Sequence, residues 1–228
     1  MTICVNLCPS VVKTYSSQSG NILFYILMAI VLIGALTIAL RDTGGMDSNI
    51  NKENAKIMAT EIARYSDEVA NGAKILLNNG VSENDIRFAI PGSVTTYGDI
   101  TSNPQNQIFS KQGGQTSYKA PPKNAATATS YSFSALRALP GVGSDKAELV
   151  MTLKGLTEES CLAVNNMFGI TNIPSNVCGS DPTVFTGTYA TSPSVFDTST
   201  VPGGIAPRFC TFCSDRGDRI YYSTVISR

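Results

Sequence analysis

The sequence predicts an α+β protein in which a long N-terminal helical spine packs on an antiparallel sheet, with a disulfide-bounded C-terminal region. Three observations lead to this fold class. Residues 21–40 form an apolar run, residues 47–79 repeat apolar side chains every three or four positions, and strand-like patterns recur in the second half of the chain. A helix with one apolar stripe must bury it, and a sheet of the same subunit is the simplest cover.

The apolar run has the length of a membrane span. From Ile22 to Leu40 it carries no charge, and Thr37 is its one polar residue besides Tyr25. At about 1.5 Å per residue the run extends roughly 28 Å, close to the ~30 Å hydrocarbon core of a bilayer. We therefore expect a single transmembrane helix at residues 21–41.

The composition limits the classes of partner and of catalytic site that the chain can have. Lysine plus arginine and aspartate plus glutamate number 17 each, and no dense basic run occurs, which argues against nucleic acid as a partner. Histidine is absent, and with it the usual general base near neutral pH and the commonest metal ligand. No Gly-rich phosphate loop with its lysine is present. We predict a protein that is not an enzyme and that uses no cofactor and no metal.

The second helix is predicted from about Asp47 to Asn79, and Gly80 is well placed to end it. Its stripe should pack on the sheet, while contact with neighbouring subunits is the alternative for part of its length. The stripe consists of Met58, Ile62, Tyr65, Val69, Ala73 and Leu76.

The remaining elements follow from turn residues and periodicity. Residues 82–85 begin either a helical turn or a strand, and the sequence leaves this open. Residues 93–129 are polar and rich in glycine and proline, which predicts a long loop that is functional or partly disordered. Its aromatic residues Tyr97, Phe109 and Tyr118 are expected to pin the loop to the body, and recognition contacts are the alternative. Strands are predicted at 130–136, 147–153 and 219–226, a short helix at 158–167, and a second polar stretch at 179–208.

Four cysteines lie in the body of the chain: Cys161, Cys178, Cys210 and Cys213. In an exported domain they are expected to form disulfides, and three connectivities are open. The local pairs, Cys161–Cys178 and Cys210–Cys213, are favoured. The Cys-x-x-Cys motif is also typical of a redox dithiol or, less often, of a metal site. A redox dithiol needs a helix start beside it, and the residues after Cys213 indicate a turn, so a structural role is favoured.

A short leader, residues 1–20, ends in Gly20 and is followed at once by the apolar run and then by the amphipathic helix. This arrangement resembles a type IV prepilin or a type II secretion pseudopilin. The resemblance implies that a prepilin peptidase cuts between Gly20 and Asn21 on the cytoplasmic face, with methylation of the new N-terminus. In that family the apolar helix first anchors the subunit in the membrane and later forms the core of a helical filament.

The chain departs from the family pattern at two positions. Family members usually carry glutamate at the fifth mature position, where this chain has Tyr25, and Phe or Met at the first, where it has Asn21. Tyr25 offers a hydroxyl to the terminal amine of a neighbouring subunit in place of the carboxylate. These departures favour a minor or divergent subunit. The order of Cys161 on a helix, a short loop and Cys178 resembles the disulfide-bounded region of type IVb pilins.

The expected function is that of a structural subunit of a type IV pilus or type II secretion pseudopilus-like filament. Residues 46–228 would form an exported pilin-like domain outside the cytoplasm, held at the bacterial inner membrane before assembly and placed at the cell surface or in a periplasmic filament afterwards. The expected partners are the prepilin peptidase, the inner membrane, and copies of this chain or other pilin-like subunits. Two alternatives stay open: a monomeric signal-anchored binding domain, and a membrane-anchored thiol oxidoreductase using Cys210 and Cys213.

Overall fold

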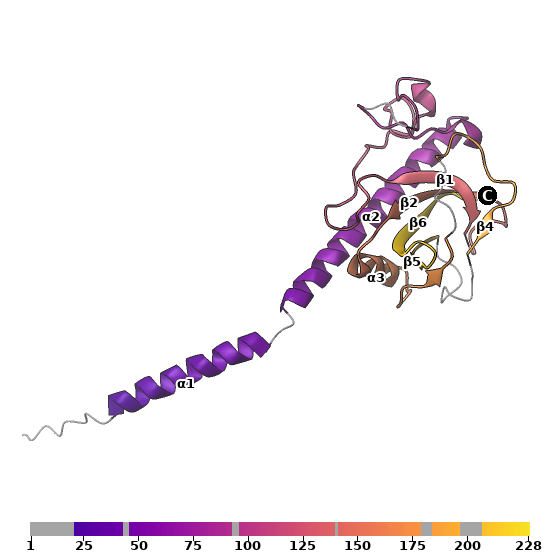
Figure 1. Ribbon diagram of the computed structural model, residues 1–228. Coiled ribbons are helices and arrows are strands. Elements are labelled where there is room, and N and C mark those ends of the chain that lie inside the picture. The colour runs from indigo at the N-terminus through magenta and orange to yellow at the C-terminus, as the bar shows by residue number, and fades with distance from the viewer. Residues whose placement is uncertain (1–20, 43–45, 93–95, 140, 179–183, 197–206) are drawn as a thin grey trace, which may run out of the picture. The chain divides into compact units, whose positions relative to one another are not determined.

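The computed structural model describes residues 21–42, 46–92, 96–139, 141–178, 184–196 and 207–228 (Figure 1). The chain divides into two units, residues 1–48 and 49–228. The predicted leader, with its cleavage residue Gly20, lies outside the described residues. The described part is an α+β fold with two disulfides in its C-terminal region, which confirms the predicted class.

The first unit contains helix α1 (Asn21–Asp42). Its large apolar side chains from Ile22 to Ile38 are all more than half exposed. Across the part of the chain that the structure describes, no helix combines the length and the apolar character that crossing a membrane requires.

Helix α2 (Met46–Asn78) matches the predicted amphipathic helix within one residue at each end. The predicted stripe is buried from Ile62 to Leu76, and Met58 is partly buried at its edge. The helix ends in a Schellman motif, in which Val81 N donates to Leu76 O at 3.0 Å and Gly80 N donates to Leu77 O at 3.0 Å. Gly80 has a φ of +85°, a conformation that glycine adopts without steric strain.

A six-stranded sheet covers the stripe, in the order β3-β5-β6-β2-β1-β4 (Figure 1). Its inner pairs, β5–β6, β6–β2 and β2–β1, are antiparallel, whereas the two-residue edge strands β3 and β4 pair in parallel. The sheet is therefore mixed, and the prediction of an antiparallel sheet holds for its centre alone. The strands are β1 (Ser132–Ala138), β2 (Glu148–Lys154), β3 (Ser175–Asn176), β4 (Ser194–Val195), β5 (Arg208–Cys213) and β6 (Asp218–Ile226).

Both faces of the sheet are buried. On β2, Leu149, Met151 and Leu153 point into the large core shared with α2, while Val150 belongs to a second cluster on the opposite face. A polar link crosses the large core, where the hydroxyls of Ser66 on α2 and Tyr221 on β6 lie 3.0 Å apart. Because each hydroxyl satisfies the other, this link fixes the position of α2 on the sheet without leaving a buried polar group unpaired.

Helix α3 (Glu158–Met167) has the bounds that the sequence predicts. The side chain of Thr157 caps it by accepting from Ser160 N at 3.2 Å. Buried Asn165 joins the helix to β5, because its Oδ1 accepts from Cys210 N at 2.7 Å and its Nδ2 donates to Cys210 O at 2.8 Å. Because the side-chain amide of Asn165 pairs with both backbone groups of Cys210, it fixes the position of α3 along β5.

The connection between α2 and the sheet is built on aromatic rings. The open question at residues 82–85 is answered by a single 3-10 turn, η1 (Glu83–Asp85), and a second such turn, η2 (Pro104–Asn106), follows in the loop. Phe88 stacks on Phe133 of β1 with ring centroids 4.0 Å apart. Tyr97 accepts from Phe133 N at 2.7 Å. The prediction that loop aromatics pin the loop to the body is confirmed for the described part.

Candidate functional site

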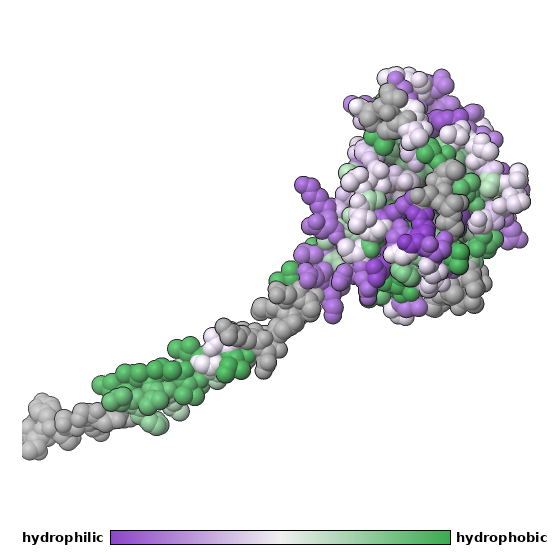
Figure 2. Space-filling view, viewed as in Figure 1, coloured by the Kyte–Doolittle hydropathy of each residue, from purple (hydrophilic) through white to green (hydrophobic). Residues whose placement is uncertain are grey.

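The first predicted site lies on α1. Figure 2 shows the surface of this helix as almost continuously hydrophobic, and Tyr25 is 62% exposed upon it. Its ring touches that of Phe24, with centroids 6.3 Å apart. Asn21 is the first residue of α1, while Gly20 of the predicted cleavage pair lies outside the described residues. The role of Tyr25 in assembly therefore stays a prediction.

The second predicted site is the set of four cysteines, all of which form disulfides. Cys161 on α3 bonds to Cys210, and Cys178 bonds to Cys213. The favoured local pairing is wrong. Cys210 and Cys213 stand three positions apart on β5, and successive side chains of a strand point to opposite faces, so their sulfurs lie on different sides of the sheet. The two bonds consequently attach one strand to α3 on one face and to the segment after β3 on the other.

This pairing also bears on the oxidoreductase alternative. A redox Cys-x-x-Cys works by opening and closing a bond between its own two sulfurs. In this chain each of the two cysteines is bonded to a distant partner and is fully buried. The geometry supports a structural role for the motif.

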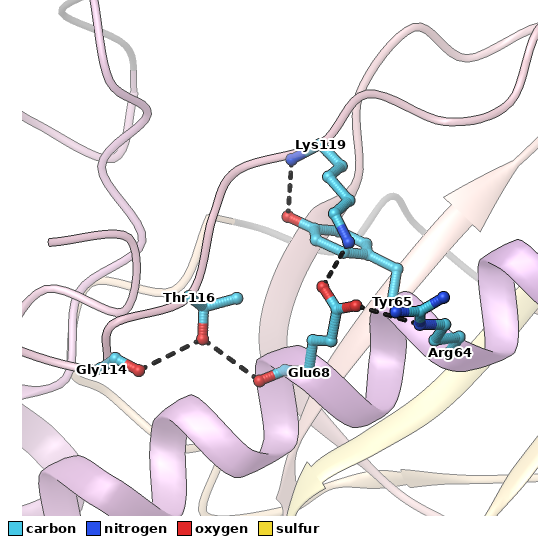
Figure 3. Close-up of polar contacts among 6 residues, drawn as sticks. All are labelled: Arg64, Tyr65, Glu68, Gly114, Thr116 and Lys119. Atoms are coloured by element: carbon cyan, nitrogen blue, oxygen red, sulfur yellow. Dashed lines mark hydrogen bonds and ion pairs between the residues drawn. The ribbon is translucent and has the colours of Figure 1, made fainter. Parts of the chain in front are cut away.

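A third candidate, which the sequence did not suggest, is the surface where the loop after η2 lies against α2 (Figure 3). Glu68 on α2 binds Lys119 of the loop at 2.5 Å and Arg64 of its own helix at 3.4 Å. The backbone N–H of Lys119 donates to the hydroxyl of Tyr65 at 3.2 Å. Thr116 donates from its hydroxyl to the carbonyl of Glu68 at 3.2 Å. Three of these contacts join the loop to α2, and together they form a loop anchor that holds an otherwise irregular segment.

A pocket of about 280 Å³ opens beside this anchor. Tyr65 and Tyr131 provide its aromatic wall, with ring centroids 4.9 Å apart. Burial raises the pKa of both tyrosine hydroxyls above the ordinary value, so that they stay protonated and act as hydrogen-bond donors or acceptors. The lining combines charged, aromatic and small apolar side chains. It consists of Glu61, Arg64, Tyr65, Lys119, Ala120, Pro122 and Tyr131.

The anchor depends on a close approach at Gly72. A Cβ atom added there would lie 2.3 Å from Thr116 Oγ1 and 3.1 Å from the carbonyl oxygen of Gly114. In a free helix alanine is more favourable than glycine by about 1 kcal/mol. We expect Gly72→Ala instead to lower the free energy of unfolding by about 1–2 kcal/mol, because the loop must move away. Urea unfolding of the full-length chain in detergent micelles, followed by tyrosine fluorescence, measures this.

Two further variants distinguish the effect of the steric clash at position 72 from the effect of helix propensity on the free energy of unfolding. Asn71→Ala changes an exposed neighbour on the same helix and should shift the free energy of unfolding by less than about 0.5 kcal/mol. In a Thr116→Ala background, the loss caused by Gly72→Ala should shrink, because the nearest clashing atom is gone. A stabilising Gly72→Ala would contradict the close approach.

Compared with protein-family models, with curated proteins and with solved structures, the chain matches none.

Proposed function

We propose that this chain is a structural subunit of a type IV pilus or type II secretion pseudopilus-like filament, anchored in the inner membrane before assembly. The observation that carries the proposal is the surface of α1, whose described large apolar side chains are all exposed while the second unit buries its own core. So large an apolar surface needs lipid or other protein around it. The described side chains, residues 22–38, extend about 26 Å, and the sequence stays apolar to Leu40.

The proposed mechanism involves no chemistry by the chain itself. The leader would be removed by the prepilin peptidase, and α1 would leave the lipid to pack against equivalent helices of other subunits. Lipid tails and apolar side chains are similar environments, so the transfer costs little free energy. Tyr25, exposed on α1, would hydrogen-bond the terminal amine of a neighbour.

Processing of the N-terminus tests the proposal directly. We expect mass spectrometry of membrane and sheared-surface fractions to find a mature chain that begins at Asn21 and carries a methyl group. Gly20→Glu should leave the chain uncut, starting at Met1 and confined to the membrane. Ser19→Ala, one residue earlier, should be cut normally and serves as the matched control. A wild-type chain that starts at Met1 in every fraction would refute a pilin-like function.

The monomeric anchored domain is the second candidate, and one observation favours it. The stripe of α2 from Ile62 to Leu76 is buried by the chain's own sheet, so this part of the helix requires no neighbour. Co-expressed Tyr25→Cys and Asn21→Cys chains distinguish the two candidates, because the proposed contact brings position 25 of one copy close to the N-terminus of a second copy. Disulfide-linked dimers in the sheared fraction support the filament, and an uncross-linked monomer in the membrane supports the anchored domain.

A further inference from the structure

A carboxylate is buried where β2 begins, away from the surfaces described above. Glu148 is 0% exposed. Its Oε2 accepts from the backbone N–H of Leu139 at 2.9 Å, and its Oε1 is buried and has no hydrogen-bond partner among the residues that the structure describes. An ionised carboxylate needs several donors or a cation when it leaves water, and one backbone N–H is far from enough. The site therefore suits the protonated, neutral form of the carboxyl group.

The charged side chains described on the neighbouring elements do not neutralise the negative charge that an ionised Glu148 would carry. Arg137 lies opposite Glu148 in the β1–β2 register, but its guanidinium is placed over the rings of Phe196 and Tyr222, at 4.8 and 5.8 Å. Among the described residues Glu148 forms no ion pair. The other charged residues nearby are Asp145 and Lys146 on the turn, and Arg228 after β6, which binds Glu83 at 3.2 Å.

The carboxyl group holds Leu139, at one end of the β1–β2 turn, of which the structure describes residues 139 and 141–147. The other end is held by Arg228, whose backbone oxygen accepts from Ser144 N at 2.6 Å. The contact is close, since a Cβ added to Gly143 would lie 2.4 Å from that same oxygen. Asp145, Lys146 and Arg228 also line a pocket of about 560 Å³ beside Tyr189. Movement of the turn would therefore reshape this pocket.

We propose that Glu148 is a pH-sensitive latch that keeps the β1–β2 turn closed against Arg228 when protonated and releases the turn when ionised. Burial raises the pKa of Glu148 from its ordinary 4.5 to about 7 in the closed state. Once the turn opens, water solvates the carboxylate and the pKa returns toward 4.5. The closed state thus binds the extra proton, and closure is favoured below pH 4.5 and weakens as the pH rises toward 7.

This device does not depend on the filament. It rests on the contacts of Glu148, Leu139, Ser144 and Arg228, all of which lie in the second unit. With the domain exported as proposed above, the surface around the turn would respond to the pH outside the cytoplasm.

Hydrogen exchange measured by mass spectrometry tests the latch in the full-length chain in detergent micelles. Glu148→Gln keeps the shape of the side chain and removes its charge, and Asp145→Asn makes the same change on the turn itself. All three proteins are compared at each pH between 5 and 8.5, so that the intrinsic pH dependence of exchange cancels. The peptide covering residues 139–147 reports the turn, and peptides from β2 and β6 report the sheet.

We expect the turn of the wild-type chain and of Asp145→Asn to lose protection, relative to Glu148→Gln, as the pH rises. The difference should reach roughly two orders of magnitude in exchange rate near pH 7.5, while the sheet peptides stay protected. Equal exchange of wild type and Glu148→Gln at every pH would overturn the proposal. So would a loss of protection shared by β2 and β6, since that would be a change in global stability and not the release of a turn. If Glu148→Gln fails to fold, the turn peptide of the wild-type chain is compared at each pH with the β2 and β6 peptides of the same chain. Protection of the turn that does not fall relative to the sheet as the pH rises overturns the latch.

Discussion

Replacing Cys161 and Cys210 together by alanine should lower the free energy of unfolding by about 4 kcal/mol. The bond closes a loop over a sequence separation of 49 residues, and the entropy that such a cross-link removes from the unfolded chain corresponds to this magnitude. Both residues are also fully buried in the core beneath α2, so their loss adds a small packing defect. Urea unfolding followed by tyrosine fluorescence measures the change, and the chain contains no tryptophan to interfere.

The other disulfide provides a matched comparison. Cys178–Cys213 closes a separation of 35 residues on the opposite face of the sheet, so its removal should cost nearly as much, again on the order of 4 kcal/mol. Reducing agent added to the native wild-type chain should act slowly, because all four cysteines are buried. If either double alanine variant lowers the free energy of unfolding by less than about 1 kcal/mol, the disulfide that it lacks does not restrain the unfolded chain.

Phe88→Ala should lower the free energy of unfolding by about 3–5 kcal/mol, the range for deleting a fully buried aromatic ring. Phe88 stacks on Phe133 and meets the rings of Tyr97, Phe109 and Phe185 edge-on, with centroids 6.2–6.4 Å away. The cavity would lie where the long connection meets β1. We therefore expect the described part of residues 96–120 to lose hydrogen-exchange protection before the sheet does.

An exposed phenylalanine serves as the control for this variant. Phe24→Ala removes a ring that is 61% exposed on α1, and it should leave the unfolding of the second unit unchanged. Phe88→Leu, which keeps most of the apolar volume, should fall between the wild type and alanine. A loss below 1 kcal/mol for Phe88→Ala would show that the site collapses around the missing ring.

The elements that the sequence predicts well are those whose pattern has one buried face or a clear cap. The stripe of α2, with Gly80 after it, and the Thr157 cap of α3 lead to the observed helices. Strand β5 was missed for the opposite reason. It is buried on both faces, with Cys210 in one core and Phe209 and Cys213 in the other, so it has no polar alternation to mark it as a strand.

The cysteine pairing and the anchor between the loop and α2 could not be predicted from the sequence for a different reason. Both join residues that lie far apart in the chain: 49 positions for Cys161 and Cys210, and 51 for Glu68 and Lys119. Local spacing favours near neighbours, and contacts of this kind are set by the tertiary fold. The buried position of Glu148 was missed likewise, since a glutamate at the start of a strand normally faces water.

The position of β6 in the sheet has a consequence for the time at which the domain can fold. This strand, which lies late in the sequence, is the one that joins β5 to β2 at the centre of the sheet. A chain that emerges N-terminal end first therefore presents α2, β1 and β2 long before their central partner. At about 5–20 residues per second, the roughly 60 residues between β2 and β6 take several seconds to appear. During that interval much of the apolar stripe of α2 is not yet buried by the sheet. An export or chaperone system must bind the chain in those seconds to keep it from aggregating.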